Sequence, residues 1–423
     1  MSKQQKSNIL PIAVMFLLFF MIAFVTNLAG SMGVIVKNQY GVSNTLSQLG
    51  TFANFIAYAC MGIPAGFLLK RKGYKFTSLT AVIVGLVGVA IQWLSGPCGS
   101  FAVYVLGAFI AGFSMCMLNV VVNPMLNTLG GGGNRGNQLN LFGGACNSIG
   151  GTITPVLVGY LVGGSIETAK VGDAAPVMII AMVAFALAAC VIFFTQIPEP
   201  HMETAEEKAL RQSGNAPKDA HSPLSFRHFV LGAIAIFFYV GVEVGIPNFA
   251  NLFMSADPAV GPAVAGTVVS VYWLLMLVGR LIGGAIGGKV SSKVMLSTVS
   301  AVAILFMLLI ICLPTTLTIQ IFGHSLPVAM LFVMLAGLCT SVMWSNIFNL
   351  AAEGLGKYTP AASGIFMALV CGGGILPLLQ GVIADHLSLT PLFSYIVPAL
   401  ALAYILFYAL LGSKNVNKDI PTE

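Results

Sequence analysis

The sequence contains few charged residues. Only 8% of its 423 residues are Asp, Glu, Lys or Arg, whereas a typical soluble domain carries roughly 25%. A water-soluble fold of this length would need far more charge to cover its surface, so the shortage excludes that class. Acidic residues are scarcer than basic ones, 13 against 19, and the formal net charge is +6.

Residues that carry catalysis or bind metals are also few and scattered. The sequence has five His and shows neither a Ser-His-Asp arrangement nor a His-rich metal spacing. The glycine-rich run GGGGNRGN, residues 130–137, lacks the Lys-Ser/Thr ending of a phosphate-binding loop. The eight cysteines match neither a disulfide framework nor a zinc site. The sequence therefore predicts no enzyme, no metal and no cofactor.

Long apolar runs make up most of the chain, and 57% of the residues are hydrophobic. Each run approaches the roughly 20 residues that cross a bilayer core as a helix. We therefore predict an all-α membrane protein with twelve transmembrane helices. The predicted spans are residues 9–36, 47–69, 77–96, 100–128, 137–164, 175–196, 228–254, 262–287, 294–314, 324–351, 360–385 and 391–412.

The basic residues indicate the orientation, because cytoplasmic loops carry an excess of Lys and Arg. With the N-terminus inside, 17 of the 19 basic residues, Arg280 among them, are assigned to cytoplasmic segments, and only Lys37 and Lys170 fall outside. Residues 1–7 do not resemble a signal peptide. We expect both termini to be cytoplasmic. The positive net charge then reflects membrane topology, and no nucleic-acid partner is expected.

A polar segment divides the chain into two groups of six spans. The predicted domains are residues 1–198, a cytoplasmic linker at 199–227, and residues 228–423. GFLLKRKGYK (66–75) is echoed by GAIGGKVSSK (284–293), and PVLVG (155–159) by PLLQG (377–381). Such parallel repeats place a substrate site between the two bundles near the bilayer midplane, and rocking of one bundle against the other gives alternating access.

Polar residues inside the apolar spans predict where a cavity lies. Asn119, Asn123 and Asn127 recur every four residues and share one helix face. Such amides can join helices, which is worth about 0.6 kcal/mol on average, or they can bind vicinal hydroxyls through paired donors and acceptors. The predicted substrate contacts are Asn27, Asn119, Asn123, Asn147, Glu243, Asn346 and Gln380. We expect no mid-span Lys or Arg and one mid-span carboxylate, a combination that favours a neutral, hydroxyl-rich substrate.

Glu243 is the acidic residue expected well inside the hydrocarbon. Its burial costs at least about 2.5 kcal/mol on insertion scales, a cost that protonation, a partner or water relieves. Glu243 could therefore contact substrate hydroxyls or bind a coupling proton or sodium ion. It could also be a protonated or paired structural group.

Five motifs resemble the fucose permease and glucose/galactose permease branch of the major facilitator superfamily, whose members include fucose:proton symporters. They are IPAGFLLKRKGYK (63–75), NPMLNTLG (123–130), FYVGVEVGI (238–246), IFNLAAEGLGKYTPAASG (347–364) and GGGILPLLQGVIAD (372–385). The resemblance covers nearly the whole chain. It implies a sugar transporter of twelve helices in the bacterial inner (cytoplasmic) membrane, commonly coupled to protons, and by analogy a monomer.

The chain departs from this family at two positions. The fucose permeases carry an Asp in the first span and a Glu in the fourth, where this sequence has Gly30 and Asn119. Glu243, in contrast, matches the glucose/galactose branch. The prediction is a secondary active transporter of a neutral hexose or deoxyhexose, such as glucose, galactose or fucose, coupled to protons or sodium. The alternatives are a facilitated sugar carrier, a carrier of another neutral metabolite or drug, and a sugar sensor that does not transport.

Overall fold

The structure is a computed structural model of the chain, and it describes residues 3–42, 46, 49–162, 169–213, 221–255, 260–321, 323–387 and 390–422. The longer helices are α1 (Lys3–Tyr40), α3 (Leu49–Cys98), α4 (Phe101–Leu129), α5 (Gly133–Leu161), α6 (Ala175–Phe194), α7 (Ala205–Gln212), α8 (Arg227–Ser255), α9 (Gly261–Ile286), α10 (Ser292–Cys312), α11 (Ala329–Thr340), α12 (Met343–Ala352), α13 (Thr359–Ala368), α14 (Gly372–His386) and α15 (Ile396–Phe407). Two strands, β1 (Thr318–Ile321) and β2 (His324–Pro327), pair antiparallel.

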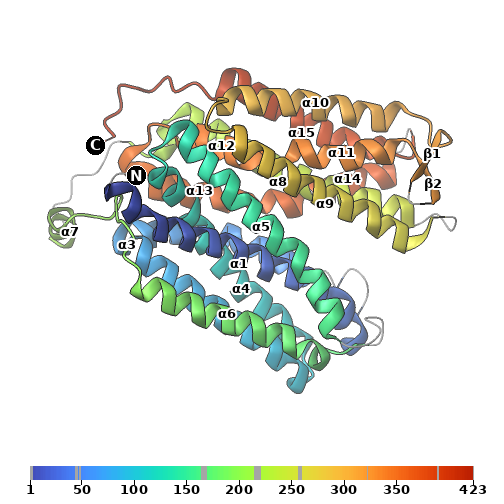
Figure 1. Ribbon diagram of the computed structural model, residues 1–423, viewed down its shortest axis with the longest axis horizontal. Helices are drawn as coiled ribbons and strands as arrows, with labels where there is room; N and C mark the ends of the chain where they lie inside the picture. Colours follow the sequence, from blue (N-terminus) through green and yellow to red (C-terminus); the bar gives the residue numbers. More distant parts are fainter. Residues whose placement is uncertain are drawn as a thin grey trace.

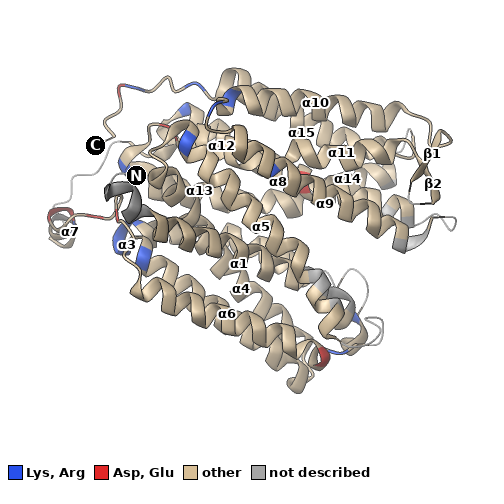
Figure 2. Ribbon diagram, in the orientation of Figure 1, with Lys and Arg blue, Asp and Glu red and all other residues tan. Residues whose placement is uncertain are grey.

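The helices form two bundles that lie side by side (Figure 1). Helices α1 to α6 make the N-terminal half, helices α8 to α15 make the C-terminal half, and the short helix α7 lies between them in the sequence. The start of α1 and the segment that follows α15 lie at the same end of the molecule, which we call the terminus end (Figure 1). Most Lys and Arg residues gather at this end (Figure 2).

Helix α3 contains two of the predicted spans, 47–69 and 77–96. A straight helix of its 50 residues would be about 75 Å long at 1.5 Å per residue, more than twice the thickness of a bilayer core. The helix is broken at Gly73, whose φ is 84° and ψ is 177°. Only glycine adopts such a conformation without steric cost, so this residue separates the two spans.

The described part of the chain contains ten segments that are long and apolar enough to cross a membrane. Because α3 is one of these ten, the break at Gly73 raises the number of spans by one. Helix α5 is as long as α4 but is rich in Gly and Asn, which lowers its hydropathy. With α5 included, the structure confirms the prediction of twelve membrane-spanning helices in two bundles.

Several predicted boundaries in the C-terminal half need correction. The tenth span was expected to begin at residue 324, but residues 324–327 form strand β2 and the helix begins at Ala329. The turn of this hairpin includes Gly323, whose φ of 76° favours glycine. The tenth span is also interrupted, since α11 ends at Thr340 and α12 begins at Met343. The eleventh is divided into α13 and α14 by a short 3-10 turn.

The two halves contact each other closely near the terminus end, where glycines allow their backbones to approach. A Cβ atom added to Gly62 in α3 would lie 2.5 Å from the Gly364 carbonyl oxygen in α13, and one on Gly66 would lie 2.6 Å from the Pro360 carbonyl oxygen. In the same region the Gln138 side chain donates to the Gly284 carbonyl oxygen at 2.9 Å. These contacts hold α3 against α13 and α5 against α9.

Candidate functional site

A cavity of about 460 Å³ lies between the two halves. Its lining comes from α1 and α5 in the N-terminal half and from α8 and α9 in the C-terminal half. The volume falls within the roughly 300–1,000 Å³ that is usual for small-molecule sites. The polar and aromatic side chains that line it include Asn27, Asn147, Ser148, Glu243, Trp273 and Arg280.

Glu243 in α8 and Arg280 in α9 form an ion pair at the wall of this cavity, with Arg280 Nη2 3.2 Å from Glu243 Oε1. The Tyr239 hydroxyl donates a second hydrogen bond to the same Oε1 at 2.9 Å. Tyr239 precedes Glu243 by one helical turn, so both side chains lie on one face of α8. The Tyr272 hydroxyl lies 3.3 Å from the Glu243 carbonyl oxygen and 3.0 Å from the Thr340 hydroxyl.

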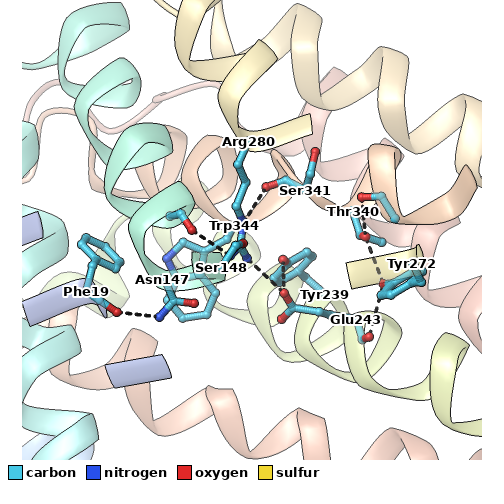
Figure 3. A network of polar contacts seen from close by, with 12 residues as sticks. Phe19, Asn147, Ser148, Tyr239, Glu243, Tyr272, Arg280, Thr340, Ser341 and Trp344 are labelled. Carbon is cyan, nitrogen blue, oxygen red and sulfur yellow. Dashed lines mark hydrogen bonds and ion pairs between the residues drawn. The ribbon is translucent and has the colours of Figure 1, made fainter. Parts of the chain in front are cut away.

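The Arg280 guanidinium is shared between the two halves (Figure 3). Its Nη1 donates to the Gly144 carbonyl oxygen at 3.0 Å and to the Ser148 hydroxyl at 2.6 Å, both in α5. Its Nε donates to the Ser341 carbonyl oxygen at 3.3 Å, at the break between α11 and α12. Arg280 is only 8% exposed, so a single planar cation connects three elements inside the protein.

This position of Arg280 corrects two sequence-based expectations. Arg280 was assigned to a cytoplasmic segment, but it lies within α9 and points into the cavity. The expectation that no cation stands in mid-span is therefore wrong. The argument for a neutral substrate is unaffected, because Glu243 balances the charge of Arg280. The signal available in the sequence was that residue 280 lies inside the predicted span 262–287.

Three of the predicted contacts line the cavity. Asn27 in α1 donates to the Ala23 carbonyl oxygen of its own helix at 2.9 Å. Asn147 in α5 donates to the Phe19 carbonyl oxygen at 3.0 Å, which joins α5 to α1. Each amide uses its nitrogen in one of these bonds and borders the cavity. Together with Glu243 they bring both halves to one site.

The fourth-span asparagines are packed between helices. The Asn119 amide donates to the Tyr58 hydroxyl at 2.9 Å and to the Met115 carbonyl oxygen at 3.1 Å. Asn123 is fully buried, and its Oδ1 accepts a hydrogen bond of 3.0 Å from Trp344 Nε1 in α12. Both residues border the interior of the bundle, and their assignment to substrate binding stays a prediction.

Asn346 and Gln380 lie in the C-terminal half and are also buried. Asn346 Oδ1 accepts a hydrogen bond of 2.9 Å from Asn137 in α5, which connects the halves near the terminus end. Gln380 in α14 is 1% exposed, and its amide nitrogen has no hydrogen-bond partner within the described residues. Gly30 lies in α1, where the structure does not describe its surroundings. Asn346 and Gln380 remain predicted contacts.

No group of three or more His, Cys, Asp or Glu side chains suited to a metal ion occurs in the described ranges. The side chains that line the cavity can bind and orient a small molecule, and the Glu243 carboxylate among them can exchange a proton. Its donors and acceptors are amides, hydroxyls and a balanced ion pair, which match a polar molecule without net charge.

Comparison with known proteins identifies the family. The sequence model of the family described as the Major Facilitator Superfamily matches residues 14–376 of this chain. The chain belongs to this superfamily. It is 35% identical over 422 residues to a glucose/galactose transporter of Brucella abortus, covering 98% of this chain and 97% of the relative. It is 23% identical over 435 residues to the L-fucose-proton symporter of Escherichia coli, covering 98% and 95%.

The fold agrees with this membership. A crystal structure of the major facilitator transporter FucP in the outward conformation superposes with a TM-score of 0.81 at 21% identity, covering 97% of this chain and all of that one. The resemblance read from the five sequence motifs is thus confirmed. The chain is a multi-pass membrane protein of a transporter family, and its relatives are described as transporters, not as enzymes.

Proposed function

We propose that this protein is a secondary active transporter that moves a neutral hexose or deoxyhexose across the bacterial inner membrane, coupled to protons. The observation that carries the proposal is the 460 Å³ cavity between the two halves, lined by side chains from both. A site at such an interface changes its access when the halves rock against each other. The glucose/galactose and fucose transporters among the relatives support a sugar as the substrate.

The chemistry of the lining suits a sugar. Asn27 and Asn147 offer amide groups to vicinal hydroxyls, and Ser148 and Thr152 add hydroxyl groups. Trp273, 39% exposed, borders the same space and can pack against the C–H face of a sugar ring. The Glu243–Arg280 pair leaves the lining without net charge, which disfavours anionic and cationic substrates alike.

Glu243 is the proposed coupling site. It is the carboxylate that lines the cavity, whereas the family's usual acidic positions hold Gly30 and Asn119 here. A carboxylate can bind a proton with or without a sugar nearby, and an amide cannot. The relatives described as fucose-proton symporters support a proton over sodium as the coupling ion.

The contacts between the halves support an outward-facing state. Gly62 meets Gly364, and Gln138 meets Gly284, near the terminus end. Of the eighteen basic residues that the structure describes, all but Lys37, Lys170 and Arg280 belong to segments at that end, and we propose on this basis that this end is cytoplasmic. By analogy with the family, we also propose a functional monomer made of two six-helix domains, 1–198 and 228–423, joined by the linker 199–227.

Uptake of labelled glucose, galactose and fucose into proteoliposomes tests the proposal. The wild type and Glu243→Gln are compared under an imposed proton gradient, a sodium gradient and no gradient, and Glu353→Gln, an exposed carboxylate near the terminus end, serves as the matched control. Proton-driven accumulation by the wild type and the control, lost in Glu243→Gln, is expected. Accumulation driven by the sodium gradient would show sodium coupling in place of proton coupling, and equilibration without any gradient would show uncoupled transport. No uptake of any sugar would overturn the proposed substrate class.

A further inference from the structure

We propose that Arg280 is a positioning residue that transmits the protonation state of Glu243 to the contact between the two halves. With Glu243 ionised, the guanidinium holds α9 against α5, and with Glu243 protonated this contact weakens and the terminus end opens. The inference rests on the proposed function, in which Glu243 is the coupling carboxylate, and it assigns to Arg280 the step that links proton binding to movement.

Arg280 has two sets of hydrogen-bond partners, and these belong to different halves of the protein. Nη2 binds Glu243 at 3.2 Å within the C-terminal half, and Nη1 binds Gly144 and Ser148 at 3.0 and 2.6 Å in the N-terminal half. A guanidinium is planar and rigid. A change in the bond at Nη2 therefore reorients the donors at Nη1, and the two sets of bonds cannot relax independently.

The electrostatics sets the direction of the effect. Within the described residues Glu243 is the only ion-pair partner of Arg280, and the Arg280 side chain is 10% exposed. A proton taken up by Glu243 from solution would leave the guanidinium as a buried cation with neutral acceptors alone. Removing one partner of a buried pair is strongly unfavourable. Separation of α5 from α9 relieves the cost, because water then reaches Arg280.

The other groups facing the pair do not supply a compensating charge. Tyr239 from α8 and Tyr272 from α9 contact Glu243, and both are neutral near pH 7 because phenols titrate near pH 10. Helix α5 presents the Ser148 hydroxyl, and the α11–α12 break presents the Ser341 carbonyl oxygen. Arg280 and Glu243 are thus the charged groups at this point in the described ranges.

The contact that Arg280 controls is closely packed. A Cβ atom added to Gly144 would lie 3.4 Å from Arg280 Cδ, so the arginine stem lies directly against the α5 backbone. Closer to the terminus end, the Gln138 side chain donates to the Gly284 carbonyl oxygen. Movement of α5 away from α9 at Gly144 would separate this second contact too. The charge of one pair can in this way influence the whole α5–α9 interface.

Electron paramagnetic resonance can measure the separation directly, without a sugar. Spin-labelled non-canonical residues at Arg135 and Lys289, exposed positions near the terminus end of α5 and after α9, report the distance between the halves in the full-length protein. The two labels should show a shorter distance when the terminus end is closed and a longer distance when it is open. In the wild type we expect the population with the longer distance to grow at least tenfold, relative to the population with the shorter distance, as the pH falls and Glu243 takes up a proton. Glu243→Gln should favour the longer distance at every pH.

Variants of Arg280 separate the proposal from a general effect of pH. Arg280→Gln should remove the pH response, Arg280→Lys should restore part of it, and the double variant Glu243→Gln/Arg280→Gln should return to the shorter distance because no unpaired charge remains. Arg227→Gln, which removes an exposed arginine at the start of α8, should behave as the wild type. A full pH response in Arg280→Gln, or a double variant that resembles Glu243→Gln, would overturn the proposal.

The wild-type titration keeps the test decisive if a variant fails to fold, since no change in distance with pH would also overturn the proposal. The sugar experiment is independent of it. If the wild type shows the expected pH response but takes up no sugar, the proposed substrate class fails and the role of Arg280 stands. If it takes up sugar with protons but Arg280→Gln keeps the pH response, the reverse holds.

Discussion

Trp344 in α12 donates a hydrogen bond from its indole Nε1 to Asn123 Oδ1 in α4, 3.0 Å away. The bond crosses between the two halves, and the same indole packs edge-on against Tyr239 and Phe366, with ring centroids 6.2 and 6.1 Å away. Tyr239 in turn donates to Glu243. The closed contact at the terminus end and the carboxylate in the cavity are therefore separated by two aromatic side chains.

Trp344→Phe should weaken this contact between the halves. The substitution keeps an aromatic ring against Tyr239 and Phe366 but removes the donor to Asn123. A typical hydrogen bond contributes about 0.5–1.5 kcal/mol net, so the open state at the terminus end should gain roughly two- to tenfold in population. The spin-label distance between Arg135 and Lys289 measures it. Trp93→Phe in α3, outside the interface, is the control, and equal distance distributions in both variants would contradict the expectation.

Gly62→Ala should prevent α3 and α13 from closing on each other. The added Cβ atom would lie 2.5 Å from the Gly364 carbonyl oxygen and 2.6 Å from the Ala368 nitrogen. Both are backbone atoms that cannot turn aside, so we expect at least a tenfold lower rate of sugar uptake. Gly266→Ala in α9 is the matched control, because nothing lies within 4 Å of its added Cβ atom. Normal uptake by Gly62→Ala would mean that this contact is not used in transport.

Asn27→Ala should reduce sugar affinity. Its amide borders the cavity, and the loss of one hydrogen bond worth about 1 kcal/mol predicts a KM roughly fivefold higher with little change in thermal stability. Uptake kinetics and the Tm in detergent measure the two quantities. An unchanged KM would remove Asn27 from the sugar site.

Asn119→Ala should act on stability instead. Asn119 is 7% exposed and donates to the Tyr58 hydroxyl, so its removal leaves a buried phenol without that partner. We expect a lower Tm and a KM within twofold of the wild type. A strongly raised KM with an unchanged Tm would instead support the sequence-based assignment of Asn119 to the sugar.

Glu199 gives the protein a pH dependence outside the membrane-spanning helices. Its carboxylate accepts hydrogen bonds from the backbone N–H groups of Tyr74 and Lys75, directly after the break in α3. Burial raises the pKa of the Glu199 carboxyl above its usual value, and these two bonds, together with the charge of Lys75, oppose the rise. The folded protein therefore holds this proton more tightly than the unfolded chain does.

The raised pKa of Glu199 in the folded protein determines how stability changes with pH. The stability contributed by protonation of Glu199 is fully present below the ordinary pKa of a glutamate and is lost as the pH rises through the raised value. The Tm of the wild type should therefore fall relative to that of Glu199→Gln as the pH rises from about 4. Melting curves of both proteins across this range measure it. A Tm difference that stays constant with pH would show that Glu199 does not titrate differently in the folded state.

The spans were predictable because hydropathy is a local property. The apolar runs of α1, α4 and α10 are each long enough to cross a bilayer by themselves. Large apolar side chains such as Phe194 and Leu400 remain 83% and 65% exposed in the fold, as expected for a bundle surrounded by lipid. The hairpin 318–327 and the break after Thr340 were missed. Both depend on how neighbouring segments supply hydrogen-bond partners, which a window of hydropathy does not contain.

The sequence by itself determined that the chain is a membrane bundle of two halves, that its interior carries amides, and that one carboxylate, Glu243, lies among apolar residues. It did so because each of these properties follows from residue type and spacing. The tertiary structure alone decided that Arg280 is the partner of Glu243 and that the same guanidinium reaches Gly144 and Ser148 in the other half. The partner of a buried charge is set by how helices distant in sequence pack, since an ion pair stabilises the fold only where the two groups meet out of water.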